Sequence, residues 1–207
     1  MVLISMSSTH LWMKMRFLAA TEENIRVASQ VVRRGGVVVY PTDTVYGLGC
    51  NSFNLDAVKR VIRVKGEREK PLPILASSMT DVEKIADISD LARRLAAEFW
   101  PGPLTIIVPK LPSLSDIVTH GLDSVGVRMP DHEVAIQLIR LSEGLLVGTS
   151  ANKTGHNPAC TAQEAWEQLG EETDVVLDGG PAPLKRPSTV IDLREERLRI
   201  LREGPLT

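Results

Sequence analysis

A basic segment in the first half of the chain has the composition to bind phosphate groups. Six Lys and Arg side chains between residues 59 and 70 face three acids between residues 56 and 70, a local excess of +3. Those expected in a loop beyond the end of a helix are Lys65, Arg68 and Lys70. Fixed cations suit a polyphosphate, because charge-assisted hydrogen bonds to phosphate oxygens are strong. Taken alone, the segment favours a simpler alternative, an ordinary solvated loop.

Four further polar clusters adjoin predicted strands. The segments 41–44 (PTDT) and 149–152 (TSAN) follow apolar runs, so their hydroxyl and amide groups fall at the carboxyl ends of strands, where α/β sheets bind ligands. The segments 100–105 (WPGPLT) and 186–189 (RPST) lead into strands, and Arg202 lies near the C-terminus. The PTDT cluster is equally compatible with a turn whose side chains satisfy their own backbone, and TSAN also fits a plain Asx or Ser turn. Taken alone, WPGPLT favours a purely structural role, a stiff turn into a strand.

The sequence lacks the common motifs of cofactor-dependent and hydrolytic enzymes. Gly47 and Gly49 are followed by Ser52 where a dinucleotide fingerprint needs a third glycine, and no P-loop, nucleophile elbow or H-E-x-x-H occurs. Cys50 and Cys160 form no C-x-x-C pair and the four histidines are scattered, so no zinc site is predicted. Familiar hydrolases, dehydrogenases and P-loop enzymes are therefore disfavoured.

Charge and hydropathy limit the partners and the compartment. The net charge of −2 excludes a globally basic nucleic-acid binder, although it allows a local basic groove. No apolar run is long enough to span a membrane. Two separated cysteines are typical of a reducing compartment, so we expect a cytoplasmic protein.

The 207 residues, 43% of them hydrophobic, suffice for one well-packed domain. Short apolar runs alternate with amphipathic segments, which indicates an α/β fold. Several of these runs are continuously apolar, which predicts a sheet with helices on both faces. We expect residues 1–14 to be an N-terminal extension without order and residues 15–207 to form one domain. The predicted strands cover residues 37–40, 74–76, 105–108, 125–127, 145–147, 175–177, 189–191 and 198–201.

Helix starts are predicted from capping residues. Thr21, Asn54 and Ser89 precede amphipathic runs that extend to residues 34, 66 and 99, and each can accept a hydrogen bond from the first turn. Capping boxes are predicted at 80–83 (TDVE) and 161–164 (TAQE), where Thr is followed three residues later by Glu. A further helix is expected over residues 134–141.

Taken in order, the motifs resemble the YrdC-like family over nearly the whole chain, from about Val31 to Leu206. The motifs are YPTDTVYGLG, KGEREKPLPIL, WPGPLT, VGVRMPDH, TSAN, PSTVIDL and ILREG. The resemblance is to the short, single-domain form, and it implies a twisted, mixed α/β sheet around a basic cavity. The best-understood members are threonylcarbamoyl-AMP synthases, which join L-threonine, bicarbonate and ATP and release pyrophosphate. Partner proteins then transfer the threonylcarbamoyl group to N6 of an adenosine in tRNA.

The resemblance also implies roles for individual residues. Those matching the threonine-holding groups are Thr44, Thr105 and Ser188. Those matching the ATP-binding groups are Lys65, Arg68, Lys70, Gly148, Ser150, Asn152, Pro158 and Arg202. Arg128 is expected to support the same cavity. Mg²⁺ is expected to arrive with ATP, with ligands that the sequence does not identify, and no tightly bound cofactor is expected.

One departure from the family pattern affects the basic loop. The family usually has K-x-R, with seven residues from the Lys to the Pro, whereas here two residues separate Lys65 from Arg68 and Pro71 follows Lys65 by six. Glu67 thus occupies the register of the usual Arg. Two alternatives stay open: a family relative without threonine-dependent activity, and an RNA-binding module that docks RNA by charge and shape. The scarcity of aromatic residues argues against the module.

Overall fold

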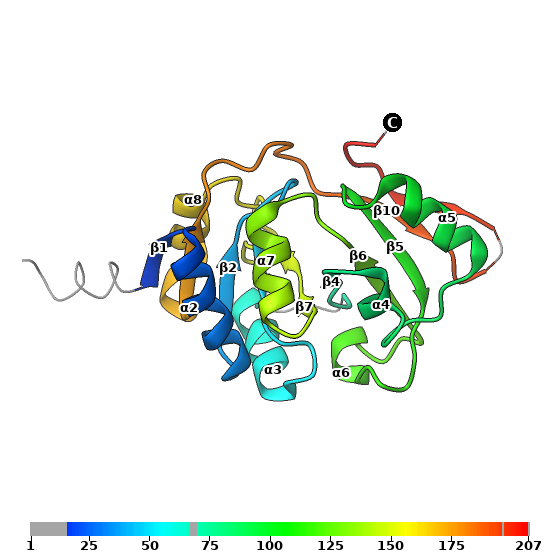
Figure 1. The fold of residues 1–207 in the computed structure, drawn as a ribbon, viewed down its shortest axis with the longest axis horizontal. Helices are drawn as coiled ribbons and strands as arrows, with labels where there is room; N and C mark the ends of the chain where they lie inside the picture. The colour runs from blue at the N-terminus through cyan, green and yellow to red at the C-terminus, as the bar shows by residue number, and fades with distance from the viewer. Residues whose placement is uncertain (1–15, 67–69, 196, 207) are drawn as a thin grey trace, which may run out of the picture.

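The strands form two mixed sheets that lie side by side along the molecule (Figure 1). A computed structural model describes residues 16–66, 70–195 and 197–206 of the chain, so the expected extension over residues 1–14 lies outside the described residues. The five-stranded sheet has the order β1-β9-β2-β3-β8, and the six-stranded sheet has the order β11-β10-β5-β6-β4-β7. The predicted α/β class is confirmed, with two sheets where the sequence suggested one.

The strands are β1 (Phe17–Ala19), β2 (Val38–Tyr40), β3 (Gly47–Gly49), β4 (Ile74–Ala76), β5 (Leu104–Pro109), β6 (Ser124–Arg128), β7 (Leu145–Val147), β8 (Thr149–Ser150), β9 (Val175–Asp178), β10 (Thr189–Asp192) and β11 (Arg199–Arg202). The helices are α2 (Glu22–Arg33), α3 (Leu55–Lys65), α4 (Met79–Val82), α5 (Asp90–Phe99), α6 (Asp116–Thr119), α7 (Glu133–Leu141), α8 (Ala162–Leu169) and the 3-10 turn η1 (Gly170–Glu172). None of these helices has both the length and the apolar composition needed to cross a membrane.

Helices cover both faces of the five-stranded sheet, as the continuously apolar strands predict. Along β2, Val38 and Tyr40 pack in one cluster with apolar residues of α2 and α7, such as Ile25 and Leu138. Val39 points the other way and joins the larger cluster, which contains apolar residues of α3 and α8. Successive side chains of a strand alternate between its two faces, so a sheet buried on both sides needs an unbroken apolar run.

In the six-stranded sheet the two faces of β5 differ, whereas the β4–β7 edge also packs against α7 through Leu75 and Leu146. Ile106 and Val108 of β5 are buried in the larger cluster with Ala92 and Ala96 of α5. The alternate residues of the same strand, including Thr105 and Ile107, line a cavity on the opposite face. The period of two along β5 therefore separates packing residues from residues available to a ligand.

Most of the predicted helix starts are confirmed. The side chains of Thr21, Asn54, Ser89 and Thr161 each accept a hydrogen bond from a backbone N–H in the first turn of a helix. The box predicted at Thr80 is wrong, because the cap of α4 is Ser78, which accepts from the N–H of Asp81. Both positions carry a hydroxyl, and local sequence does not distinguish which one has the extended backbone that a cap requires.

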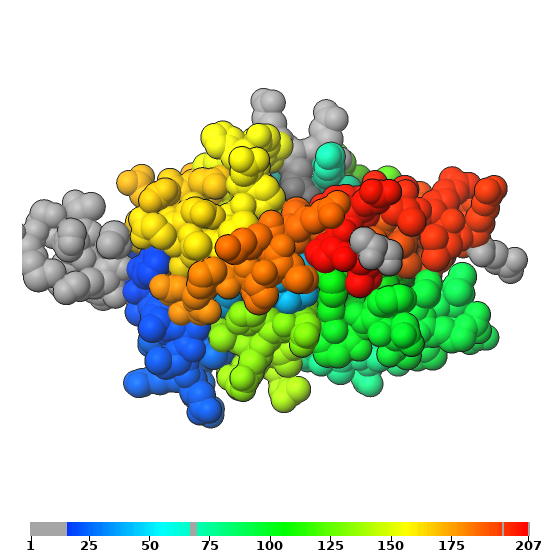
Figure 2. Space-filling model, turned by 90° about the horizontal axis from the view of Figure 1, so that it is seen from above, coloured from blue at the N-terminus to red at the C-terminus, as the bar shows by residue number. Residues whose placement is uncertain are grey.

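The connection from β9 to β10 joins the two sheets. It crosses the upper side of the molecule in Figure 1 and runs over the middle of the face seen in Figure 2. Tyr46, next to β3, fixes this connection with its hydroxyl group, which donates to the carbonyl oxygen of Gly180 at 2.6 Å and accepts from the N–H of Gly179 at 3.2 Å. The backbone N–H of Leu184 also donates to the carbonyl oxygen of Asp43. The connection is thus held against the segment that contains the PTDT cluster.

Candidate functional site

A cavity of about 520 Å³ lies between the two sheets. Residues of β5, β6, β10 and β11 form one wall, and residues around β3 and β8 form another. Its described lining contains four cationic side chains and no carboxylate. The cations are Lys70, Arg128, Arg194 and Arg202. A hollow lined in this way concentrates positive potential and attracts anionic ligands, even in a chain with a net charge of −2.

Arg128 is held rigidly at the inner end of the cavity. Its side chain is almost completely buried, and Nε donates to the carbonyl oxygen of Gly102 at 2.9 Å. Nη1 donates to Oγ1 of Thr44 at 2.8 Å, and Nη2 forms an ion pair with Oδ1 of Asp43. Burial lowers the pKa of Arg128, and the charge of Asp43 opposes that shift. A guanidinium group has five N–H donors, so two remain for a ligand.

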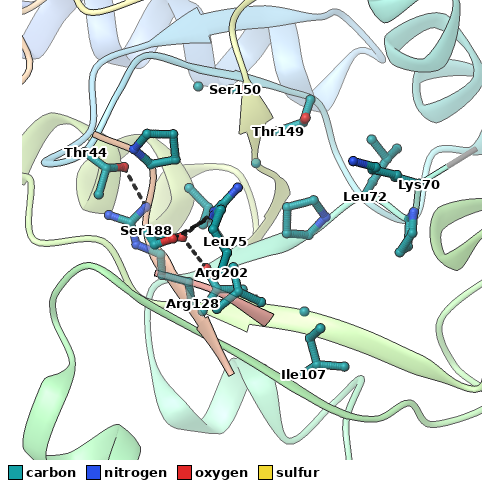
Figure 3. A pocket seen from close by; sticks show the side chains of 18 of the residues that line it. Thr44, Lys70, Leu72, Leu75, Ile107, Arg128, Thr149, Ser150, Ser188 and Arg202 are labelled. Atoms are coloured by element: carbon teal, nitrogen blue, oxygen red, sulfur yellow. Dashed lines mark hydrogen bonds between the residues drawn. The ribbon is translucent and has the colours of Figure 1, made fainter. Parts of the chain in front are cut away.

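The hydroxyl group of Ser188 links β5 to β11 through Thr105 and Arg202. Its Oγ shares a hydrogen bond of 2.8 Å with Oγ1 of Thr105 and accepts from Nη2 of Arg202 at 3.1 Å. Nε of Arg202 also donates to the carbonyl oxygen of Ser188 at 2.9 Å. Figure 3 shows that Ser188, Arg202, Thr44 and Arg128 gather at one end of the cavity, which we call its inner end. Arg202 has no carboxylate partner among the described residues.

Lys65 lies behind the cavity wall. It is the last residue of α3, not a loop residue as the sequence suggested, and it is only 2% exposed. Its Nζ donates to the carbonyl oxygens of Ser150 and Asn152, both at 2.6 Å, and to Oδ1 of Asn152 at 3.0 Å. The same Oδ1 accepts from Oγ of Ser150 at 2.6 Å. The buried ammonium group therefore supports the turn that presents Ser150 to the cavity.

Gly148 and Pro158 also line the cavity, as does Lys70 at the end away from Thr44 (Figure 3). A Cβ atom on Gly148 would lie 2.2 Å from Cγ of Leu75, so only glycine fits at this point without displacing β4. The close approach keeps β4 beside the turn between β7 and β8.

The structure brings together most of the residues predicted for the site. Those that line the cavity are Thr44, Lys70, Thr105, Arg128, Gly148, Ser150, Pro158, Ser188 and Arg202. Lys65 and Asn152 stand behind this lining in contact with Ser150, and Arg68 and Glu67 lie outside the described residues. The assigned roles of these residues stay predictions.

The sequence analysis assigned no role to several lining residues, among them Arg194 and Thr42. Arg194 follows β10 and forms an ion pair of 2.6 Å with Asp192, whose pKa is lowered because Arg194 donates hydrogen bonds to it. Only its position just after a strand could have indicated it. Thr42 lines the cavity beside Thr44, and the PTDT cluster already contained it. In the described part of the chain, no group of three or more His, Cys, Asp or Glu side chains could hold a metal ion.

Comparison with known proteins supports the same grouping of motifs. The family model Sua5/YciO/YrdC, described as telomere recombination, matches residues 30–204. The chain is 42% identical to the threonylcarbamoyl-AMP synthase of Pyrococcus abyssi, over 89% of this chain and 55% of that protein. It is 39% identical to a putative threonylcarbamoyl-AMP synthase of Mycobacterium tuberculosis, over 85% of this chain and 82% of that protein.

The fold of a solved relative agrees as well. The crystal structure of P. abyssi Sua5 complexed with L-threonine superposes with a TM-score of 0.88 at 40% identity. The match covers 91% of this chain and 57% of that one, so the chain spans little more than half the length of the P. abyssi relative. Sequence and fold together lead to one conclusion: the chain belongs to the Sua5/YciO/YrdC family.

Proposed function

We propose that the protein is an L-threonylcarbamoyladenylate synthase, a nucleotidyltransferase that joins L-threonine, bicarbonate and ATP and releases pyrophosphate. Its product would supply the N6-threonylcarbamoyladenosine modification of tRNA through a downstream transferase complex. The observation that carries the proposal is a cavity with cations, paired hydroxyls and no carboxylate in its described lining. Relatives named threonylcarbamoyl-AMP synthase, one of them solved with L-threonine, support the choice of substrate.

The inner end of the cavity suits an amino acid. The two remaining N–H groups of Arg128 can bind a carboxylate, and Arg202, which the family resemblance assigns to ATP, lies beside them on Ser188. Within the pair of Ser188 and Thr105, one hydroxyl hydrogen is used between the two oxygens and the other is left to donate to a ligand. Donors thus surround the position of the carboxylate, and Thr44 supplies an oxygen beside them.

The opposite end of the cavity suits a nucleoside triphosphate. Lys70 lies there, and the turn that carries Ser150, with the charge of Lys65 behind it, belongs to the cavity wall around β3 and β8. The bound substrate would be the Mg²⁺ complex of ATP, and its phosphates and waters would supply most of the metal's ligands. We expect Arg68→Ala to weaken ATP binding; unchanged affinity would show that the shortened basic loop does not contact the phosphates.

The proposed chemistry needs no nucleophilic side chain. Bicarbonate gives carbon dioxide by loss of hydroxide, and the amine of threonine forms a bond to that carbon dioxide and loses a proton to the hydroxide, which gives a carbamate and water. A carbamate oxygen then attacks the α-phosphorus, and the bond from that phosphorus to the bridging oxygen breaks as pyrophosphate leaves. The protein must hold two anions in line and neutralise charge on the leaving group, which fixed cations can do.

Threonine-dependent release of pyrophosphate tests the proposal. Purified protein is incubated with ATP, Mg²⁺, bicarbonate and labelled L-threonine, with controls that omit bicarbonate or replace threonine by L-valine. Pyrophosphate and a labelled adenylate are expected only in the complete mixture. Release without threonine would favour a relative with another acceptor. Absence of release, combined with salt-sensitive RNA binding, would favour the RNA-binding module. Direct RNA binding and a cytoplasmic location stay predictions.

A further inference from the structure

Two threonine hydroxyls beside Arg128 form a short chain whose proton positions can be assigned. Oγ1 of Thr42 lies 2.6 Å from the carbonyl oxygen of Val45 and 3.1 Å from Oγ1 of Thr44. The backbone N–H of Thr44 also donates to Oγ1 of Thr42 at 3.2 Å. Both side chains are at most 3% exposed, and both line the cavity.

The acceptors around the chain fix the direction of each hydrogen bond. A carbonyl oxygen can only accept, so the single hydroxyl hydrogen of Thr42 goes to Val45. Oγ1 of Thr42 must then accept in its contact with Thr44, and Thr44 is the donor. Because Thr44 also accepts from Nη1 of Arg128, its oxygen keeps one lone pair and no hydrogen for a ligand.

We propose that Thr42 is a positioning residue that turns Thr44 into a pure acceptor and thereby selects an amino acid with a side-chain hydroxyl donor. The proposal rests on the proposed function, because it takes threonine as the ligand. The neighbouring groups, Arg128 and the pair of Ser188 and Thr105, present donors. Thr44 can only accept, so a ligand must supply a hydrogen at this point, whereas the pair of Ser188 and Thr105 can both donate and accept.

The physical basis of selection is the cost of an unpaired buried group. An analogue of threonine with fluorine in place of the hydroxyl has nearly the same shape but no hydrogen to donate, so its fluorine would face the lone pair of Thr44. A site built to bind a hydroxyl rejects such an analogue strongly. Without the hydroxyl of Thr42, the Thr44 hydroxyl can rotate and donate, so the penalty against fluorine should fall.

The test compares Thr42→Val, which removes the hydroxyl and keeps the shape, with Thr42→Ser, which keeps the hydroxyl. Binding of L-threonine, the fluorinated analogue and L-valine is measured by calorimetry, and ATP binding serves as a control for the integrity of the cavity. We expect Thr42→Val to narrow the preference for threonine over the fluorinated analogue by about tenfold, and Thr42→Ser to preserve it. ATP affinity should remain unchanged in both variants.

Three results separate the possible failures. If the wild-type protein binds none of the amino acids, the proposed function is wrong. If the wild type binds threonine and Thr42→Val weakens the binding of all three amino acids equally, Thr42 only stabilises its turn and the inference is wrong. Should Thr42→Val fail to fold, Thr42→Cys gives the same comparison, because a thiol is a weak acceptor, and an unchanged preference there would equally overturn the inference.

Discussion

The ammonium group of Lys65 donates to the carbonyl oxygen of Asn152 at 2.6 Å, which joins the end of α3 to the turn after β8. It also donates to the carbonyl oxygen of Ser150 at 2.6 Å. A buried cation with several oxygen acceptors is stable, whereas the same acceptors without it would be unsatisfied. Lys65 thus combines a structural role with a positive charge behind the proposed nucleotide end of the cavity.

Replacing this cation should affect both stability and nucleotide binding. In Lys65→Met the side chain keeps its length, but the two carbonyl oxygens and Oδ1 of Asn152 lose a donor. We expect a loss of about 1–3 kcal/mol in the free energy of unfolding, measured with urea. ATP affinity should fall more than threonine affinity, because Ser150 loses its support. Equal losses of both affinities would contradict the assignment of this turn to the nucleotide.

The buried pair of Asp43 and Arg128 gives a second prediction. Asp43→Ala leaves the guanidinium group buried without its carboxylate, which should cost about 3–5 kcal/mol of stability. The double variant Asp43→Ala/Arg128→Met removes both charges and should be less destabilised than the single variant. Denaturant unfolding of the two variants measures the difference, and a double variant that is the less stable of the two would refute this account.

Removing the hydroxyl of Ser188 should weaken the binding of threonine more than the binding of ATP. Ser188→Ala takes away a group at the inner end of the cavity and one acceptor of Arg202, so threonine affinity should fall about tenfold and ATP affinity less. Ser124→Ala is the matched control, since it removes the same atoms from another part of the cavity wall. Thr44→Ala should behave like Ser188→Ala. Comparable losses for both substrates in Ser188→Ala would remove the basis for placing threonine at this end.

The imidazole group of His132 predicts a dependence of stability on pH. Burial lowers its pKa below the usual value of 6.5, although the charges of Asp43, Asp131 and Glu133 oppose the shift. The folded state therefore binds fewer protons than the unfolded state, and stability should be full above pH 6.5 and decline as the pH falls below it. In His132→Asn this decline should disappear, as seen by comparing unfolding free energies at pH 8 and pH 5.5.

The same substitution should also stabilise α7. His132 stands at the N-cap of that helix and makes no capping hydrogen bond, whereas Asn can accept one from the first turn. At pH 8 we expect a gain of about 0.5–1 kcal/mol. If the unfolding free energies of the two proteins changed in parallel from pH 8 to pH 5.5, the pKa of His132 would be the same in the folded and unfolded states, and the predicted pH dependence would be wrong.

Local features of the fold could be predicted because they depend on neighbouring residues. Thr21, Asn54 and Ser89 cap helices as expected, since a cap and its N–H donor lie within three residues of each other. The division into two sheets could not be predicted, because pairing of β10 with β5 and of β9 with β2 joins segments far apart in the chain. Sequence periodicity carries no information on such pairing.

The site shows the same limit. The clusters with Thr44, Ser150 and Ser188 were recognisable from their order along the chain, and the structure gathers them around one cavity. The burial of Lys65 was not recognisable, because a lysine at a helix end is usually solvated. Its three acceptors come from a turn about 85 residues later, and only tertiary contacts place them there.

The late position of β10 and β11 in the chain has a consequence for biosynthesis. Ser188 and Arg202, which complete the inner end of the cavity, are synthesised after β1 to β9. A nascent chain that stops before residue 188 contains the sequence of every described helix but lacks β10 and β11, one edge of the six-stranded sheet. The cavity is incomplete until β11 has been synthesised, so a product truncated before residue 188 should bind neither threonine nor ATP productively.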